Sequence, residues 1–283
     1  MSKSRFPVAS YSSIITHHTS LITMFSQFQK RIYELEHLDK GDYTPDEYEG
    51  CMVELRRVNR FLGDASALRH SLLAEIEREG LNSFSVLDVG AGSGELLRVA
   101  AGWAQETERK ALLVGLELNA RSAKATLEES REFASINSVR GDALRLPFAD
   151  DCFDYAICSL FTHHFKDEQV VAILNELNRV ASRRVFVIDL HRHPLAYYLY
   201  TTVGHLFLHN RLIREDGALS ILRGFRPGEL NQLASQAHLT NVSVERRFPF
   251  RLVLSGKKET RRRGDTATRG KEKSPAEFVI GDH

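Results

Sequence analysis

The residues with the clearest capacity for chemistry follow a short apolar run, Val86 to Val89, that contains Asp88. Glycines then alternate with other residues at Gly90, Gly92 and Gly94. Glycine adopts backbone conformations that are costly for other residues, and it allows a ligand to lie close to the main chain. Asp88 could orient this loop or accept a hydrogen bond from an ammonium group, and the following helix offers free N–H donors. The motif therefore predicts a ligand site built largely from bare backbone.

The spacing of these glycines distinguishes this loop from a dinucleotide-binding loop. The dinucleotide fingerprint GxGxxG would need glycine at position 95, where the sequence has Glu95. A carboxylate next to a pyrophosphate at a helix N-terminus would repel it. NAD is therefore the alternative cofactor, and an NAD-dependent oxidoreductase the corresponding alternative function. The sequence also lacks GxxxxGK[ST], so it gives no support to nucleotide triphosphate chemistry.

Two more acids follow apolar runs further along the chain. Glu117 ends the run that starts at Leu112, where a carboxylate could accept hydrogen bonds from both hydroxyls of a ribose. Asp142 follows a third short run and could accept from an adenine amino group. Acids at strand ends also arise by chance. These acids indicate a ligand site because they occur together with the glycine loop, which precedes Glu117 by about one βαβ half-unit.

Four histidines follow the fourth and fifth apolar runs, namely His163, His164, His191 and His193. The carboxyl ends of parallel strands form the ligand-binding edge of such a sheet. A histidine there could take the proton of a phenol, whose pKa is about 10, as its oxygen attacks. A structural hydrogen bond is the alternative role for each of them. We select His164 and His191 as the candidate catalytic residues.

His205 and His209 are four residues apart and would share one face of a helix, an arrangement that could hold a metal ion. No carboxylate or cysteine spacing accompanies them, and Gly204 weakens the helix. We therefore predict no functional metal.

The elements that must position these residues alternate between short apolar runs and helical stretches after Gly80. This alternation predicts βαβ units and a parallel sheet. The last two runs, joined near Pro249, predict an antiparallel hairpin. The predicted fold is α/β and Rossmann-like, with a seven-stranded, mostly parallel sheet over residues 81–256. A helical pattern from Phe25 to Gly80 predicts an N-terminal helical cap over residues 26–80.

One apolar segment interrupts the alternation at about residues 192–216. It is too rich in large side chains for a connector, and we predict a lid helix over the carboxyl edge of the sheet. These side chains are Leu195, Tyr197, Tyr198, Tyr200, Leu206 and Phe207. A lid of this composition predicts a hydrophobic substrate.

The amino-acid composition limits the class of protein and the kind of partner. The 283 residues are 42% hydrophobic and 27% charged, which is typical of a globular protein. The net charge is +1, and residues 256–283 carry eight Lys or Arg against five Asp or Glu. The rest is close to neutral, so no nucleic-acid partner is expected.

Cysteine use and the chain termini predict where the protein resides. The three cysteines form no CxxC pair, which favours a reducing, cytoplasmic location. The sequence has no run of membrane-span length and no N-terminal signal core, so no stable membrane insertion is expected. We predict a flexible leader over residues 1–25 and a charged, disordered tail over 257–283. The sequence leaves the oligomeric state open.

Together, the glycine loop, the strand-two acid and the turn Gly141 to Phe148 resemble the class I S-adenosylmethionine (SAM)-dependent methyltransferases. The resemblance is to the small-molecule group that includes ubiquinone and menaquinone methyltransferases, and it covers roughly Phe84 to Leu254. It implies SAM as the cofactor. It further implies that the methionine moiety is bound by Asp88, Gly90, Ala91, Gly92 and Gly94, and that the ribose and ring face are bound by Glu117 and Leu118. The adenine would be bound by Asp142 and Ala143, and the sulfonium would face Ser159 and Leu160.

The segments SLFTHHF, DLHRHPLAYY and REDGALSILRGFRPGEL are also similar to methyltransferases associated with type III polyketide synthases, which act on phenolic or resorcinolic lipids. The expected function is methyl transfer, in secondary metabolism, to oxygen or carbon of a small hydrophobic phenolic acceptor such as a polyketide or quinone precursor. Oxygen is favoured because the histidines are possible bases. A non-catalytic SAM-binding protein is a further alternative. Nucleic-acid methylation is disfavoured because SLFTHHF stands where amino-methylating enzymes carry [ND]PP[YFW].

Overall fold

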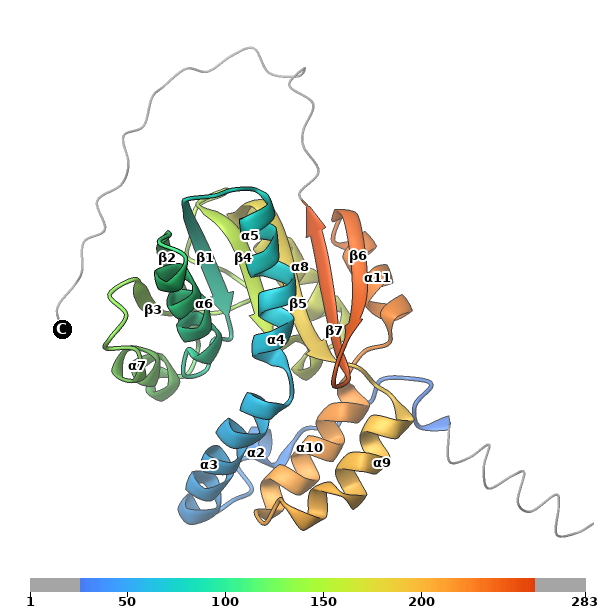
Figure 1. The fold of residues 1–283 in the computed structure, drawn as a ribbon. Helices are drawn as coiled ribbons and strands as arrows, with labels where there is room; N and C mark the ends of the chain where they lie inside the picture. Colours follow the sequence, from blue (N-terminus) through green and yellow to red (C-terminus); the bar gives the residue numbers. More distant parts are fainter. Residues whose placement is uncertain (1–25, 258–283) are drawn as a thin grey trace, which may run out of the picture.

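The computed structural model describes residues 26–257, so the predicted leader and all of the predicted tail beyond Lys257 lie outside the described residues. Seven strands form one sheet in the order β3-β2-β1-β4-β5-β7-β6 (Figure 1). The strands are β1 (Ser83–Val89), β2 (Lys110–Glu117), β3 (Ile136–Arg140), β4 (Phe153–Ser159), β5 (Ala181–Leu190), β6 (Thr240–Arg247) and β7 (Arg251–Lys257). The first five are parallel, and β7 runs antiparallel to both β5 and β6. The predicted Rossmann-like sheet with its C-terminal hairpin is confirmed.

Helices cover both faces of this sheet, because the central strands are apolar on both sides. On β1, Leu87 and Val89 face a core shared with α8 (Asp167–Val180) and α11 (Pro227–Gln236). Val86 faces the opposite core, which includes side chains of α6 (Glu95–Glu106). Another helix, α7 (Ala120–Glu129), lies against β2 and β3. Strand order reverses between β1 and β4, so both strands end at the switch point where open sheets of this kind bind ligands.

The segment predicted as a cap divides into two parts. One helical run, α4 (Asp64–Leu68), η1 (Arg69–Leu73) and α5 (Ala74–Arg78), packs its buried leucines and Ile76 on the sheet. In contrast, α2 (His37–Lys40) and α3 (Pro45–Phe61) project beyond the carboxyl ends of the strands (Figure 1). Helix α3 begins at Pro45, after Thr44. Thr44 Oγ1 accepts from the Glu47 N–H, and the Glu47 carboxylate accepts from the Thr44 N–H.

The helical pattern predicted near the start of the chain is wrong for residues 31–36, which form no regular element. We call residues 26–36 the N-terminal strap. Its central side chain, Arg31, is buried and donates hydrogen bonds to the carbonyls of Arg223, Phe165 and His163, and it pairs with Asp167. These long-range bonds hold the strap extended against its local helical preference.

The predicted single lid helix is instead a pair of helices, α9 (Pro194–Thr202) and α10 (Arg211–Arg223), joined through the short turn η3 (Gly204–Leu206). Each helix has its own cap, since the Leu195 N–H donates to His193 Nδ1 and the Leu212 N–H donates to Asn210 Oδ1. Figure 1 shows α9 and α10 beside α2 and α3, gathered at the carboxyl edge of the sheet. Within residues 26–257 no helix combines the length and apolarity needed to cross a bilayer.

Candidate active site

The glycine loop after β1 has the backbone geometry that its sequence predicts. Gly90, Gly92 and Gly94 have φ values of 75°, 55° and 78°, in the left-handed region. A Cβ built at Gly90 would lie 2.4 Å from the Phe161 ring, whereas one built at Gly92 would meet nothing within 4 Å. Gly92 therefore faces open space with its main chain bare, as close contact with a ligand requires.

Asp88 lies beneath this loop as a buried carboxylate with an unused oxygen. Its side chain is 3% exposed, and among residues 26–257 its Oδ1 has no hydrogen-bond partner. Burial, followed by the charge of Glu117, raises the pKa of Asp88 to about 7. Buried polar atoms rarely stay unpaired, so this oxygen fits a donor supplied by a ligand, such as an ammonium group.

The raised pKa of Asp88 makes a prediction for stability. The carboxyl binds its proton more tightly in the folded chain, at a pKa of about 7, than at the ordinary value of 3.8. The stability it contributes is therefore fully present below about pH 4 and is lost as the pH rises to about 7. We expect the ligand-free protein to lose more stability than its Asp88→Asn variant between these pH values, as measured by thermal unfolding. Parallel loss in both proteins would contradict this, and the exposed Asp46→Asn variant serves as the control.

A first cavity of about 580 Å³ opens above the loop. Of the predicted cofactor residues, six line it, namely Asp88, Gly90, Ala91, Gly92, Ser159 and Leu160. The opposite wall, which no sequence motif predicts, is formed by α3 and α4 through Tyr48, Glu49, Met52, Val53, Leu55, Asp64 and Ala65. These residues belong to a helical pattern that carries no chemical signal of its own.

The other five predicted cofactor residues do not line the first cavity. Gly94 caps α6, and Glu117 accepts hydrogen bonds from the N–H groups of Gly92 and Asn119. Leu118 is 63% exposed, Asp142 accepts from the Leu144 N–H, and Ala143 is buried. Glu117 thus fixes the loop at Gly92. The ligand-binding roles of these residues remain predictions.

A second cavity of about 600 Å³ lies between the lid helices, α3 and the carboxyl ends of β4 and β5. Its wall is mostly apolar, and its polar side chains include three histidines, His163, His164 and His191. Two leucines, Leu55 and Leu160, line both cavities. The two chambers therefore adjoin at an apolar boundary.

Of the predicted catalytic residues, His164 lies beside two acids that the sequence analysis missed, Glu36 and Asp39. His164 Nδ1 is 3.8 Å from Glu36 Oε1 and from Asp39 Oδ2. Burial alone would lower the pKa of His164, but Asp39 and Glu36 outweigh it and raise that pKa. His164 is therefore the histidine of this cavity that most readily holds a proton.

His191, the other predicted catalytic residue, has a pKa shifted in the opposite direction from that of His164. It lines the second cavity, and its ring centroid lies 5.2 Å from that of His193. Burial, and then the charges of His193, Arg246, Arg226 and Arg192, lower the pKa of His191 to about 4. This ring is neutral near pH 7 and binds a proton weakly.

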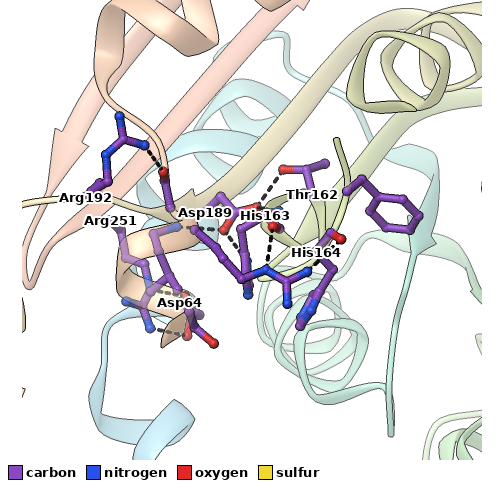
Figure 2. Close-up of polar contacts among 12 residues, drawn as sticks. Asp64, Thr162, His163, His164, Asp189, Arg192 and Arg251 are labelled. Carbon is purple, nitrogen blue, oxygen red and sulfur yellow. Dashed lines mark hydrogen bonds and ion pairs between the residues drawn. The ribbon is translucent and has the colours of Figure 1, made fainter. Parts of the chain in front are cut away.

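His163 is tied to Asp189, a buried acid at the end of β5. His163 Nδ1 lies 2.7 Å from Asp189 Oδ1, and the Thr162 hydroxyl donates to Asp189 Oδ2 at 2.6 Å (Figure 2). His163 is among the four histidines singled out from the sequence, whereas Asp189 is not. A sequence signal for Asp189 exists, because the apolar run Val185 to Leu190 contains an acid near its end, as the run Val86 to Val89 does.

Glu36, His163 and His164 place possible metal-ligand atoms within 4.8 Å of one another. The guanidinium of Arg223 lies 3.7 Å from Glu36 Oε1, and repulsion from it disfavours a metal ion at this point. The earlier candidate pair lacks the shared helical face, because His205 lies in η3 and His209 follows it outside any helix. The structure thus favours proton chemistry for this cluster.

Comparison with known proteins agrees with this geometry. Residues 86–184 match the family described as a methyltransferase domain. The demethylmenaquinone methyltransferase of Roseiflexus sp. is 34% identical over 131 residues, covering 45% of this chain and 50% of that protein. The 2-phytyl-1,4-naphtoquinone methyltransferase of Synechococcus elongatus is 32% identical over 112 residues, covering 38% and 46%. The chain spans about half the length of these curated relatives.

Solved structures show the same fold at low sequence identity. A protein from Pyrococcus horikoshii is 15% identical with a TM-score of 0.51, over 73% of this chain and 99% of that one. Magnesium protoporphyrin IX methyltransferase from Synechocystis, solved with bound S-adenosylhomocysteine, is 15% identical with a TM-score of 0.50, over 88% and 100%. The match to the family, the strand order and the glycine loop lead to one conclusion: residues 86–184 belong to a class I SAM-dependent methyltransferase domain, distantly homologous to menaquinone methyltransferases.

Proposed function

We propose that this protein transfers the methyl group of SAM to a hydroxyl oxygen of a small, hydrophobic, phenolic acceptor. The observation that carries the proposal is the contact between the two cavities at Leu55 and Leu160. The first cavity holds the glycine loop and the unpartnered Asp88 oxygen, which suit SAM. The second is apolar and carries histidines on its wall, which suits a phenol.

The chemistry makes few demands on the protein, because the sulfonium of bound SAM supplies an already activated methyl group. What the chain must do is align the acceptor oxygen and exclude water. Leu55 and Leu160 keep the boundary between the cavities apolar. A histidine of the second cavity, for which His164 and His191 are the sequence-based candidates, takes the phenolic proton. Because a base for an O–H proton is present, methylation of oxygen is favoured over methylation of carbon.

The decisive experiment combines binding with turnover. We expect calorimetry to detect SAM binding and no binding of NAD. Mass spectrometry should then detect a methyl group added to oxygen in one or more members of a panel of alkylated phenols. A quinone precursor with a free ring carbon tests the C-methylation alternative. SAM binding without turnover of any acceptor would support a non-catalytic SAM-binding protein, and binding of NAD in place of SAM would overturn the proposal.

The lid makes a separate prediction about the acceptor. Phe207 and its neighbour Leu206 are similarly exposed, at 69% and 72%, but only Phe207 lines the second cavity. We expect Phe207→Ala to raise the acceptor KM about 10-fold, since it removes an aromatic contact worth about 1.5 kcal/mol, and to leave the SAM Kd unchanged. The matched variant Leu206→Ala should change neither. Equal effects on acceptor and SAM would contradict the assignment of the second cavity.

Tyr197 belongs to the same predicted lid segment as Phe207, and the same measurement distinguishes the two residues. The Tyr197 ring packs edge-on against Phe28 of the strap, with ring centroids 5.6 Å apart. Tyr197 does not line the second cavity. We therefore expect a smaller change in acceptor KM for Tyr197→Ala than for Phe207→Ala.

A further inference from the structure

Asp189 is fully buried at the end of β5, and three of the four hydrogen bonds to its carboxylate hold the turn that carries His163. Oδ1 accepts from the Leu190 N–H at 2.7 Å and lies 2.7 Å from His163 Nδ1. Oδ2 accepts from the Thr162 hydroxyl at 2.6 Å and from the His163 N–H at 3.1 Å. Burial opposes ionisation, but His163 and these hydrogen bonds outweigh it and lower the pKa of Asp189. The carboxylate is therefore charged and held in one orientation.

This orientation fixes the tautomer of His163. Its Nδ1 donates its proton to Asp189, which leaves the lone pair of the neutral ring on Nε2. His163 also lines the second cavity, although its side chain is only 4% exposed. Burial lowers the pKa of His163, so the ring is neutral near pH 7. Its free nitrogen can then accept a proton.

We propose that His163 is the general base of the reaction and that Asp189 is its positioning residue, an inference that rests on the proposed function. The acceptor O–H proton moves to His163 Nε2, and an oxygen lone pair forms the bond to the methyl carbon. The carbon–sulfur bond breaks, its electron pair stays on sulfur, and a neutral thioether leaves. Asp189 stabilises the imidazolium that forms, as a carboxylate does in a histidine–carboxylate pair.

The environment of His163 favours it over the other two histidines. His164 lies against Asp39 and Glu36, which raise its pKa, whereas the pKa of His163 is lowered by burial. His191 lacks an acidic partner among residues 26–257, and its pKa is lowered to about 4. All three histidines line the second cavity, and of the three only His163 has a ring nitrogen within hydrogen-bond distance of a carboxylate in the described part of the chain.

The charged groups around His163 are few and come from four elements. They are Asp189 of β5, His164 of the same turn, Glu36 of the strap, and the arginines Arg31 and Arg223, which donate to the His163 carbonyl. The arginines and Glu36 persist in any variant at position 189. A change in the pH profile of such a variant is therefore assigned to the His163 pair.

The test compares His163→Gln and Asp189→Asn with wild type on two phenols. For an alkylated phenol that is neutral at the assay pH, we expect kcat to fall about 10²- to 10⁴-fold with the SAM Kd unchanged. The wild-type kcat should rise with pH on a limb that both variants lack. For a nitro-substituted phenol that is already ionised, no proton has to be removed, and both variants should retain close to the wild-type kcat.

Controls separate catalysis from folding. Asp154→Asn changes an aspartate on the neighbouring strand that hydrogen-bonds Ser85 and is absent from the lining of either cavity, so it should keep the wild-type kcat on both phenols. Equal loss on both phenols by His163→Gln would reveal a structural role and overturn the proposal. So would a selective loss on the neutral phenol by His164→Gln or His191→Gln with His163→Gln unaffected. Absence of turnover in wild type would instead refute the proposed function.

Discussion

The Gly92→Val variant is expected to lose SAM affinity by 100-fold or more while the protein remains folded. Gly92 has a φ of 55°, and a β-branched residue in this region costs about 1–3 kcal/mol of strain. The added side chain would also project into open space beside the loop, where a ligand approaches the main chain. Together these effects correspond to about 3 kcal/mol, or two powers of ten in Kd. Titration calorimetry with SAM measures the change.

A matched glycine in the next helix provides the control. A Cβ at Gly102 of α6 would likewise meet nothing within 4 Å, but Gly102 does not have a positive φ. Gly102→Val should therefore leave the SAM Kd unchanged. If Gly92→Val binds SAM as tightly as this control does, the glycine loop is not where the cofactor lies.

The second large effect is expected at the buried ion pair between α4 and β7. Asp64 Oδ1 lies 2.5 Å from Arg251 Nε, and both side chains are buried (Figure 2). Asp64→Ala leaves the Arg251 charge buried without its partner, which should lower the free energy of unfolding by about 3–5 kcal/mol. Urea unfolding monitored by circular dichroism measures this loss.

Two further variants identify the cause of that loss. The double variant Asp64→Leu with Arg251→Met removes both charges, and we expect it to regain most of the stability, because the penalty comes from an unpaired buried charge. Lys124→Ala breaks the exposed pair with Glu128 on α7 and should cost no more than about 0.5 kcal/mol. A small loss in Asp64→Ala, comparable with Lys124→Ala, would show that water reaches the buried guanidinium.

The sheet could be predicted from the sequence because each of its strands is a local signal. The runs around Val86 and Val185 are apolar on both faces and bounded by turns, and only a parallel sheet between two helical layers buries such runs. The glycine loop was predictable for a similar reason. Its alternate residues have left-handed φ values, and the sequence has glycine at each of these positions.

The strap and the acid–histidine pair could not be predicted in the same way. The carbonyl that Arg31 Nε bonds belongs to Arg223, 192 residues away, and no local pattern encodes that distance. The two-helix lid was read as one helix because the turn at Gly204 is as apolar as the helices it joins. Likewise, Asp189 can act on His163 only because the turn after the neighbouring strand places the two side chains in contact.

The walls of the two cavities share α3 but differ in their other segments, with a consequence for engineering. Of the residues that line the second cavity, only Leu160, His163 and His164 lie within the methyltransferase domain matched at residues 86–184. Most of the others belong to residues 190–221, none of which lines the first cavity. Replacing the lid helices α9 and α10 by those of a relative, with α3 and α4 kept, should therefore change the acceptor preference and leave the walls of the first cavity intact.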